Sequence, residues 1–432
     1  GTKDGIPKTP DWAAVLTGIA APAIINLARQ MAMQRTFITL SLSIQRGDHG
    51  EQTYWAGITL AALLGQIGLP GGGIGFGYSA LGGVGNPRSN TPGPTFPQGQ
   101  NPTNSFIPVA RLTDMLLTPG ALFNYNGQEL SYPDIKLIYW AGGNPFHHQQ
   151  DLARLTKAWR EPQTVIAHEI WWNPLARHAD IVLPATTTLE RNDIGFNSAD
   201  AHIIAMQQAR APVQQARSDF AILSGIAKRL GCFEAFTENR DEKEWLHFIY
   251  ENYRERHTAE LPEFSEFWAT GSAEIAPAEP ETVFLADFRA NPNTHPLPTP
   301  SGKIELFSNT IAGFEYDDAP GQAIWLAPAE WLSAEATQRF PLHLLSNQPG
   351  NRLHSQFDQG KASQAGKVAG REGIFIHPED AATRGIEAGT LVRIFNDRGA
   401  CLAGAILSTD LQPGVVMLPT GAWFDPEYSS NG

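Results

Sequence analysis

Residues 135–193 read IKLIYWAGGNPFHHQQDLARLTKAWREPQTVIAHEIWWNPLARHADIVLPATTTLERND and decide the fold. Three apolar runs in this stretch are predicted strands: Ile135–Ala141, Thr164–Ala167 and Ile181–Leu183. A helical pattern over Gln150–Trp159 separates the first two. Continuous apolar strands separated by a helix are typical of a parallel sheet that is covered on both faces. Because ligands bind beyond the carboxyl ends of such strands, the polar loops that follow them are expected to line one crevice.

A second strand–loop–helix unit precedes this stretch, and a different pattern follows it. A β-branched strand is predicted over Thr36–Ile44 and a long helix over Tyr54–Ile67. Gly71–Asn104 is rich in Gly and Pro and is expected to form an ordered loop that packs on other parts of the chain. From Phe340 onward, short strands and turns such as Asn396–Gly399 predict a small β domain. The predicted fold class is therefore α/β, with doubly wound parallel-sheet units followed by a C-terminal β-barrel domain.

Composition excludes several classes of function. The formal net charge of −13 and the lack of a basic face argue against a nucleic-acid partner. Cys232 and Cys401 lie far apart and show no CxxC or Cys/His spacing, so a zinc site, an iron–sulfur site or a disulfide framework is not expected. No uninterrupted apolar run reaches the length of a membrane span, because Gly and Pro interrupt Trp12–Ala32.

The two ends of the chain have the character of cut ends. Position 1 is Gly rather than Met, and no signal sequence precedes it. Tyr428–Gly432 follows abruptly on a structured-looking segment. We therefore expect this chain to be a piece of a longer protein.

Two of the polar loops suggest a nucleotide. Gly142 and Gly143 carry no Cβ, so the backbone there can approach a ligand closely, although a plain strand-to-helix turn explains them equally well. They are not part of a GxGxxG pattern. Glu169 ends the second strand, where nucleotide-binding folds place an acid on a ribose hydroxyl or a base edge. Its carboxylate would accept from a hydroxyl or a guanine-type pair of N–H groups, and the alternative is a surface glutamate.

Other charged residues are open to two readings. Adjacent His147 and His148 on a turn are expected to point in different directions, so a metal site there is disfavoured and His148 would rather donate to a phosphate or base. Arg191 and Asp219 are either ion-pair partners or ligand contacts. Arg46 follows a strand at a loop that opens onto a helix, which suits a phosphate, and the alternative is a solvated guanidinium.

The segment Ser346–Gln356 is an unusually polar loop after a strand of the β domain. It offers amides, hydroxyls, an imidazole and a guanidinium within a few residues, which suits a pterin, a purine or a diphosphate. A solvated loop is the alternative. No nucleophile with a paired base is found, and the chain has no GxSxG.

Several segments together resemble the molybdopterin oxidoreductases of the dimethyl sulfoxide reductase family, and within it the S- and N-oxide reductases. They occur in the family's order and span nearly the whole chain. The segments are SIQRGDHGEQ (43–52), LGQIGLPGGGIGFGY (64–78), GGNPFHHQQD (142–151), VIAHEIWW (165–172), ARHADIVLPATTTLERNDIG (176–195), RLHSQFD (352–358) and VRIFNDRGACLAGA (392–405).

The resemblance implies a cofactor, Mo-bis(molybdopterin guanine dinucleotide), and the residues that would contact it. A strand end in contact with the cofactor matches Leu42, Ser43 and Arg46. Positions around one guanosine and its diphosphate match Asn144, His148, His168, Glu169, Arg191 and Asp219. The pterin-cradling loop matches Ser346, Asn347, Gln348, Pro349, Arg352, His354, Ser355 and Gln356. Leu42 departs from the family, which commonly has Trp there, and Gln149 stands where relatives often carry His.

The resemblance also implies an activity and a division of the chain. The complete protein would take an oxygen atom from a small sulfoxide or amine N-oxide in a two-electron reduction. The family's N-terminal half supplies the serine ligand of molybdenum and the substrate pocket, and no part of this chain matches it. We therefore expect the C-terminal portion of such a reductase, inactive in isolation, with no catalytic residue or metal ligand of its own. No electron donor follows from the resemblance, and a cytoplasmic location is expected.

Three parts are expected within this portion. Residues 1–128 would be an α/β segment of the molybdopterin oxidoreductase domain with the long Gly/Pro loop. Residues 129–335 would be a second, Rossmann-like α/β cofactor-binding domain. Residues 336–432 would be a truncated β-barrel domain that binds the molybdopterin dinucleotide.

Two alternative functions use the same features. One is a nicotinamide-dependent dehydrogenase built on the same sheet, which lacks the GxGxxG pattern. The other is a non-catalytic fragment or subunit that binds nucleotide.

Overall fold

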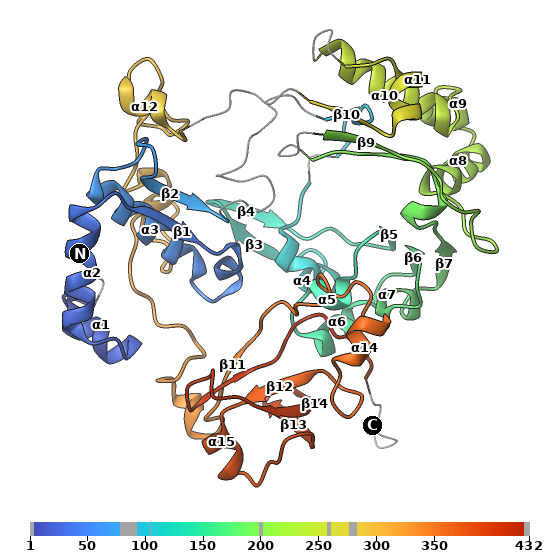
Figure 1. The fold of residues 1–432 in the computed structure, drawn as a ribbon. Helices are drawn as coiled ribbons and strands as arrows, with labels where there is room; N and C mark the ends of the chain where they lie inside the picture. Colours follow the sequence, from blue (N-terminus) through green and yellow to red (C-terminus); the bar gives the residue numbers. More distant parts are fainter. Residues whose placement is uncertain are drawn as a thin grey trace.

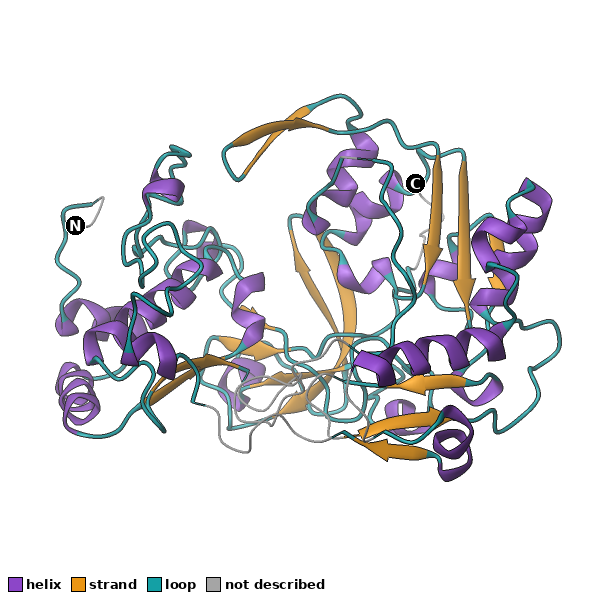
Figure 2. Cartoon of the chain, turned by 90° about the horizontal axis from the view of Figure 1, so that it is seen from above, coloured by secondary structure: helices purple, strands orange, loops and turns teal. Residues whose placement is uncertain are grey.

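Among the described residues, the buried apolar side chains form three separate hydrophobic cores rather than one. The computed structural model describes residues 4–77, 93–103, 105–197, 202–256, 261–275 and 283–426. Helices and strands are interleaved along the chain, with long loops between them (Figure 2). This mixed α/β architecture with parallel sheets agrees with the predicted class.

The N-terminal unit pairs two short parallel strands beside three helices. Its elements are α1 (Pro10–Thr17), α2 (Ala21–Met33), β1 (Phe37–Leu40), η1 (Leu42–Arg46), α3 (Gly50–Leu64) and β2 (Gly73–Phe76). Thr9 begins α1 by accepting the backbone N–H of Trp12, with Pro10 in the first turn. Among the described residues no single helix is both long and apolar enough to cross a membrane; only α1 and α2 taken together are, and they are bent by 117°.

The predicted strand over Thr36–Ile44 is too long. It ends at Leu40, and Leu42–Arg46 form a 3-10 turn instead, which the Ser41 hydroxyl begins by accepting the N–H of Ser43. The predicted loop over Gly71–Asn104 contains the strand β2, and residues 78–92 and 104 of it lie outside the described residues.

The central unit is the parallel sheet that the opening stretch predicts. A short segment first forms η2 (Val109–Arg111), α4 (Leu112–Leu117) and the hairpin β3 (Leu122–Tyr125) and β4 (Gln128–Ser131). The sheet follows as β5 (Leu137–Ala141), α5 (Pro145–His148), α6 (Leu152–Ala158), β6 (Thr164–Glu169), α7 (Pro174–Arg177) and β7 (Ile181–Pro184). Its strand order is β5-β6-β7 and both pairings are parallel, so this prediction is confirmed.

A third unit packs helices against an antiparallel sheet. Its elements are η3 (Thr188–Glu190), β8 (Asp193–Gly195), β9 (His202–Met206), α8 (Asp219–Leu230), α9 (Phe233–Thr237), α10 (Glu242–Arg256), α11 (Phe264–Thr270) and β10 (Ser272–Glu274). Aromatic rings fill its core, where Tyr250 and Phe267 stack at 4.3 Å. The connection to the last unit carries α12 (Ala286–Ala290), α13 (Asn309–Ala312) and η4 (Glu335–Gln338).

The C-terminal unit is a curled, open sheet, a half-barrel, where the sequence predicts a truncated β-barrel domain. Its elements are β11 (His343–Leu345), α14 (Lys361–Ala365), β12 (Gly373–Ile376), α15 (Pro378–Ala382), β13 (Leu391–Asn396), β14 (Gly399–Leu407) and β15 (Val415–Met417). The strand order is β11-β15-β12-β14-β13. Closure would require pairing of the two end strands, β11 and β13, which is not among the pairings of the described residues.

The central and C-terminal units meet through aromatic packing. Phe146 is 1% exposed, and its ring stacks on two others. The distance between ring centroids is 4.2 Å to His178 and 5.8 Å to Phe424. Arg177 adds an ion pair with Asp425 at 3.4 Å. The helix α5, which carries the predicted His148, is therefore fixed to the end of the described chain.

The whole chain exposes far more surface than a single compact body. Its accessible area is 27148 Å². A compact monomer of 47.1 kDa exposes about 16,000 Å². The units are thus spread apart, and much of each faces outward (Figure 1).

Phe146→Ala should destabilise the contact between these two units. Loss of a fully buried phenylalanine ring costs about 3–5 kcal/mol because it removes transfer free energy and leaves a cavity. Urea unfolding followed by tryptophan fluorescence measures the change. The matched control is Phe284→Ala, whose ring is 59% exposed, and it should change stability little. Equal effects of the two substitutions would contradict this assignment of the core.

Candidate functional site

The carboxyl ends of the three parallel strands lie at one edge of the central sheet. Ala141 pairs with His168, and Glu169 pairs with Pro184, so the strands stop together. Gly142 and Gly143 follow β5 with φ of +79° and +78°, which only glycine adopts readily. No atom lies within 4 Å of the position that a Cβ would take at Gly142, so the backbone is open to a ligand there.

Asn144 begins α5 and joins it to the C-terminal unit. Its side-chain oxygen accepts the N–H of Phe146 at 3.2 Å, and its amide donates to the Ser355 hydroxyl at 3.4 Å. Asn144 is buried, and so is Ser355. Two predicted residues from distant parts of the sequence therefore touch directly.

His168 is buried and uses both ring nitrogens within the protein. Nε2 lies 2.6 Å from the Tyr139 hydroxyl, and Nδ1 lies 2.6 Å from the Asp219 carboxylate. Asp219 is the first residue of α8, and its side chain is 53% exposed. His168 thus orients the Asp219 carboxylate, and the Asp219 side chain remains partly exposed to solvent at this edge of the sheet.

Glu169 is a half-buried acceptor at the end of β6. Burial raises the pKa of Glu169, while hydrogen bonds from the Asn173 side chain and the Ile170 N–H act in the opposite direction. Asn173 also begins α7 by accepting the N–H of Ala176. The carboxylate is thus held by its neighbours in a region of low solvation, where it can discriminate between donors.

Arg191 follows η3 (Thr188–Glu190), and its side chain reaches back to Thr186, two residues after the end of β7. Its guanidinium donates to the Thr186 carbonyl at 2.9 Å and to Asp193 at 3.1 Å. The Thr186 hydroxyl is buried and has no hydrogen-bond partner among the described residues. A ligand hydroxyl or phosphate oxygen would satisfy that group.

Three histidines gather where the central and C-terminal units meet. The ring centroids of His147 and His148 are 5.0 Å apart, and they lie 5.4 and 5.7 Å from that of His354. Burial, followed by the neighbouring His148 and His354 and then Arg46, lowers the pKa of His147 to about 4. Burial, His354 and Arg46 also lower the pKa of His148. The sequence expectation that the adjacent histidines diverge is wrong, since both approach His354.

The predicted polar loop presents His354 through its own hydrogen bonds. The Gln348 amide pairs with His354 Nδ1 at 3.1 Å and accepts the His354 backbone N–H at 3.3 Å. The Asn347 carbonyl accepts the N–H of Thr420 at 2.8 Å. Ser346 and Gln356 are exposed, and Pro349 is half-buried.

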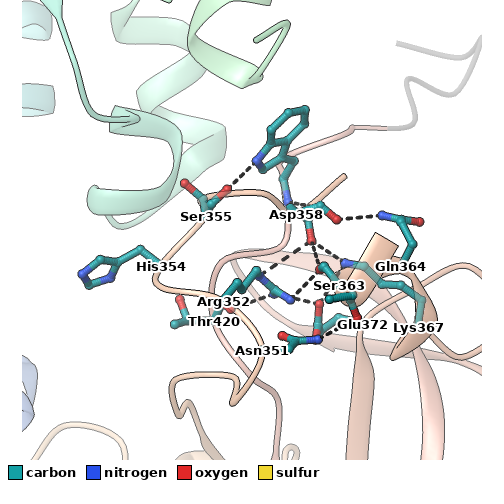
Figure 3. A network of polar contacts seen from close by, with 12 residues as sticks. Asn351, Arg352, His354, Ser355, Asp358, Ser363, Gln364, Lys367, Glu372 and Thr420 are labelled. Atoms are coloured by element: carbon teal, nitrogen blue, oxygen red, sulfur yellow. Dashed lines mark hydrogen bonds and ion pairs between the residues drawn. The ribbon is translucent and has the colours of Figure 1, made fainter. Parts of the chain in front are cut away.

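Arg352 turns away from the other predicted residues of this loop (Figure 3). Its side chain is 1% exposed. It donates to Ser363 at 2.9 Å, to Glu372 at 2.9 Å and to the Thr420 carbonyl at 3.1 Å. Its guanidinium therefore binds protein groups inside the C-terminal unit.

Leu42 and Ser43 belong to the 3-10 turn that ends in Arg46. Leu42 is 41% exposed, and the Ser43 hydroxyl lies 2.7 Å from that of Ser41. Of this turn, only Arg46 is tied to the histidine cluster, through its charge.

The predicted residues thus form two groups along one face. Asn144, His148, His354 and Ser355 form one group at the meeting of two units. His168, Glu169, Arg191 and Asp219 form the other at the ends of β6 and β7. A cavity of about 720 Å³ near Val165 and Asp180 lies at the opposite ends of these strands and is lined by none of the predicted residues. In the described part of the chain, no group of three or more His, Cys, Asp or Glu side chains could hold a metal ion.

A model of the molybdopterin oxidoreductases matches residues 12–229. This chain belongs to that family. A second model, of the molybdopterin dinucleotide binding domain, matches residues 342–431 of this molybdopterin oxidoreductase. The two matches confirm the expected cofactor, Mo-bis(molybdopterin guanine dinucleotide).

Relatives of this molybdopterin oxidoreductase include S- and N-oxide reductases. A biotin sulfoxide reductase of Cereibacter sphaeroides is 49% identical over 430 residues, which cover 99% of this chain and 57% of that protein. A dimethyl sulfoxide/trimethylamine N-oxide reductase of the same organism is 44% identical, with 99% and 54% covered. A trimethylamine-N-oxide reductase of Haemophilus influenzae is 42% identical, with the same coverage. The chain therefore spans about half the length of the curated relatives that it matches.

A solved structure shares the fold. Acetylene hydratase from Pelobacter acetylenicus aligns with a TM-score of 0.53 at 21% identity, over 67% of this chain and 38% of that one. At this identity the likeness supports the architecture only.

The residues at the site fit a guanine dinucleotide. A half-buried carboxylate at Glu169 matches the adjacent N–H donors of guanine. The imidazoles of His148 and His354, with Arg46 nearby, match a diphosphate. The open glycine backbone at Gly142 allows close approach of the cofactor.

The sequence analysis missed two residues that shape the site. His147 completes the imidazole cluster, and its position next to His148 was the signal. Asn173 holds Glu169, and the Asn-Pro pair before α7 marks it as a helix cap.

His147→Gln should flatten the dependence of stability on pH. Because the pKa of His147 is about 4 in the folded chain and near 6.5 when exposed, only the unfolded chain takes up this proton as pH falls between those values. Stability is therefore lost across that window, and the substitution removes this part of the loss. Urea unfolding at a series of pH values measures it, with His295→Gln at an exposed position as the control. Parallel curves for wild type and His147→Gln would refute the prediction.

Proposed function

We propose that this chain is the cofactor-binding portion of a molybdenum-dependent S- or N-oxide reductase. The reaction removes an oxygen atom from a sulfoxide or an amine N-oxide in a two-electron reduction. The observation that carries the proposal is the meeting of two folding units at Asn144–Ser355 and at the histidine cluster. A long dinucleotide needs contacts of this kind from separate loops. The names of the relatives supply the substrate class.

The chain's own residues bind and orient the cofactor. When bound, the molybdenum centre supplies the redox chemistry of oxygen-atom transfer, and the protein supplies position. Glu169 accepts from the guanine edge, and His148, His354 and Arg46 face the diphosphate. The full set proposed to contact the cofactor or support those contacts is Leu42, Ser43, Arg46, Asn144, His148, His168, Glu169, Arg191, Asp219, Ser346, Asn347, Gln348, Pro349, Arg352, His354, Ser355 and Gln356.

His147 need not be charged before the anion arrives, because Arg46 already supplies a positive charge nearby. The pKa of His147, lowered to about 4, leaves that ring neutral near pH 7, and the pKa of His148 is lowered as well. A bound diphosphate favours the protonated form of a nearby imidazole, because opposite charges attract in a partly buried region. Cofactor binding would then draw protons onto the cluster and strengthen each charge-assisted hydrogen bond.

We further propose that the chain works within a longer polypeptide. The large exposed area and the relatives of nearly twice its length support this. In that setting the doubly wound units and a closed C-terminal barrel would be completed, and the division at residues 128 and 335 would apply. The cytoplasmic location remains a prediction from the resemblance. The comparisons give no support to the nicotinamide-dependent alternative.

Glu169→Gln should weaken guanine recognition selectively. The amide replaces one acceptor oxygen with a donor, which opposes the guanine N–H groups, and loss of a charged hydrogen bond costs about 1.5–3 kcal/mol, or ~10- to 100-fold in affinity. Calorimetric titration of the 432-residue chain with guanosine diphosphate and adenosine diphosphate measures it. Affinity for the adenine nucleotide should change little.

Glu161→Gln is the matched control for this experiment. Glu161 is exposed and lies just before β6, at the end of the strand opposite to Glu169. If both glutamine variants bind guanosine diphosphate as wild type does, Glu169 does not contact the base.

The longer protein that contains this chain should contain molybdenum and guanosine, with guanosine in twofold excess as the bis form of the cofactor requires. It should also reduce dimethyl sulfoxide, biotin sulfoxide or trimethylamine N-oxide with a reduced viologen as electron source. Elemental analysis, nucleotide release and viologen oxidation test these points. The isolated 432-residue chain with added cofactor should show no turnover. Turnover by the isolated chain, or a longer protein without molybdenum, would overturn the proposal.

A further inference from the structure

A compact core of paired charges lies directly behind the loop that carries His354 and Ser355 (Figure 3). Its four members are all largely buried: Arg352, Asp358, Lys367 and Glu372 have side-chain exposures of 1%, 4%, 8% and 14%. Two positive and two negative side chains balance. Charges so far from water persist only when each is paired and hydrogen-bonded.

Asp358 is the member that joins the charge core to Trp423. Its Oδ1 accepts from Lys367 at 2.7 Å and from the Ser363 hydroxyl at 3.3 Å, and it faces Arg352 Nε at 3.8 Å. Its Oδ2 accepts the backbone N–H of Trp423 at 3.1 Å. One carboxylate therefore joins three segments: the polar loop, the helix α14 and the chain after β15.

The segment after β15 also contacts the polar loop directly, at His354 and Ser355. The Trp423 indole donates to the Ser355 carbonyl at 2.8 Å. Gly421 lies so close that a Cβ there would be 1.9 Å from the His354 carbonyl oxygen. Arg352 also donates to the Thr420 carbonyl, which ties the charge core to this segment again.

His354 needs this support because its backbone is strained. Its φ is +51°, in the left-handed region that a residue with a Cβ disfavours. Such a conformation persists only where surrounding contacts determine it. His354 and Ser355 lie on the outer side of the loop, away from the charge core (Figure 3). They are the residues that meet His147, His148 and Asn144.

We propose that Asp358 is a positioning residue: through Arg352 and Trp423 it fixes the loop that presents His354 and Ser355 to the central unit. Asp358 does not touch the imidazole cluster itself. It fixes the position of the His354 ring relative to His147 and His148. Its importance for cofactor binding rests on the proposed function, whereas its control of His354 does not.

Asp358→Asn in the 432-residue chain tests this through the titration of labelled histidines by NMR. Without the carboxylate the loop relaxes, and the His354 ring leaves its place beside His147 and His148. The pKa of His147 should then rise above about 4, because movement of the loop exposes the His147 ring to water and takes the His354 ring away from it. The pKa of His148 should rise as well. No nucleotide is needed, so a failure of the proposed function would not affect this readout.

Asp380→Asn is the matched control. Asp380 also accepts a backbone N–H, from Gly414 at 2.7 Å, and pairs with a cation, Arg384, in the same unit. Within the described part of the chain, its hydrogen bonds and its ion pair reach Thr383, Arg384 and Gly414, and not the polar loop. This variant should lower the melting temperature without moving the His147 or His148 titration.

Trp423→Phe is the second variant, and it leaves the four charges in place. It removes only the indole N–H that holds the Ser355 carbonyl, so a smaller shift of the His147 pKa in the same direction is expected. It decides the matter if Asp358→Asn does not fold. Wild-type titration of both histidines in Trp423→Phe, and in Asp358→Asn where it folds, would overturn the proposal and leave the charge core a stabilising element only.

Discussion

The parallel register of β5, β6 and β7 is the constraint on which the candidate site depends. Ala141 pairs with His168, and Glu169 pairs with Pro184. The three strands therefore end at the same edge of the sheet. Backbone hydrogen bonds set that register, and a slip of one residue would turn every side chain to the other face. The opposite ends of the strands hold a cavity that none of the predicted residues line, so the candidate site follows the carboxyl ends of the strands and not this cavity.

Electrostatics at this edge differs from that of the chain as a whole. The formal net charge is −13, yet the place where the central and C-terminal units meet gathers His147, His148 and His354 near Arg46. The lowered pKa values of His147 and His148 favour their neutral forms, which limits repulsion between these two rings. An anion bound beside them would favour protonation, a response that the ordinary pKa of a lysine does not allow near pH 7.

The sequence could predict where the strands of the central sheet end and their loops begin, because apolar runs and the Gly142-Gly143-Asn144 turn reflect local conformational preferences. It could not predict where side chains point. Arg352 reads as a ligand contact in a polar loop, but its partner Glu372 lies twenty residues on, and only the fold brings them together. The strand before Arg46 was predicted too long because the Ser41 hydroxyl captures a backbone N–H, a local competition that β-branched composition conceals. A β-barrel was predicted from the run of short strands after Phe340, but closure of a barrel depends on pairing between the end strands β11 and β13, which are far apart in sequence.

The open arrangement of the units has a consequence for how precisely the site is held. In the described part of the chain, the central and C-terminal units contact each other through the rings around Phe146, the Trp171–Phe357 ring pair, the Arg177–Asp425 ion pair, the Asn144–Ser355 hydrogen bond and the rings of the histidines. Each is small, and none is a large apolar interface. The side chains of the candidate site must therefore be held in place by contacts within each unit. In the central unit the His168–Asp219 pair does this, and in the C-terminal unit the buried charges behind His354 do so. A ligand that spans both units would therefore meet groups that are already held in place, which lowers the cost of ordering them on binding.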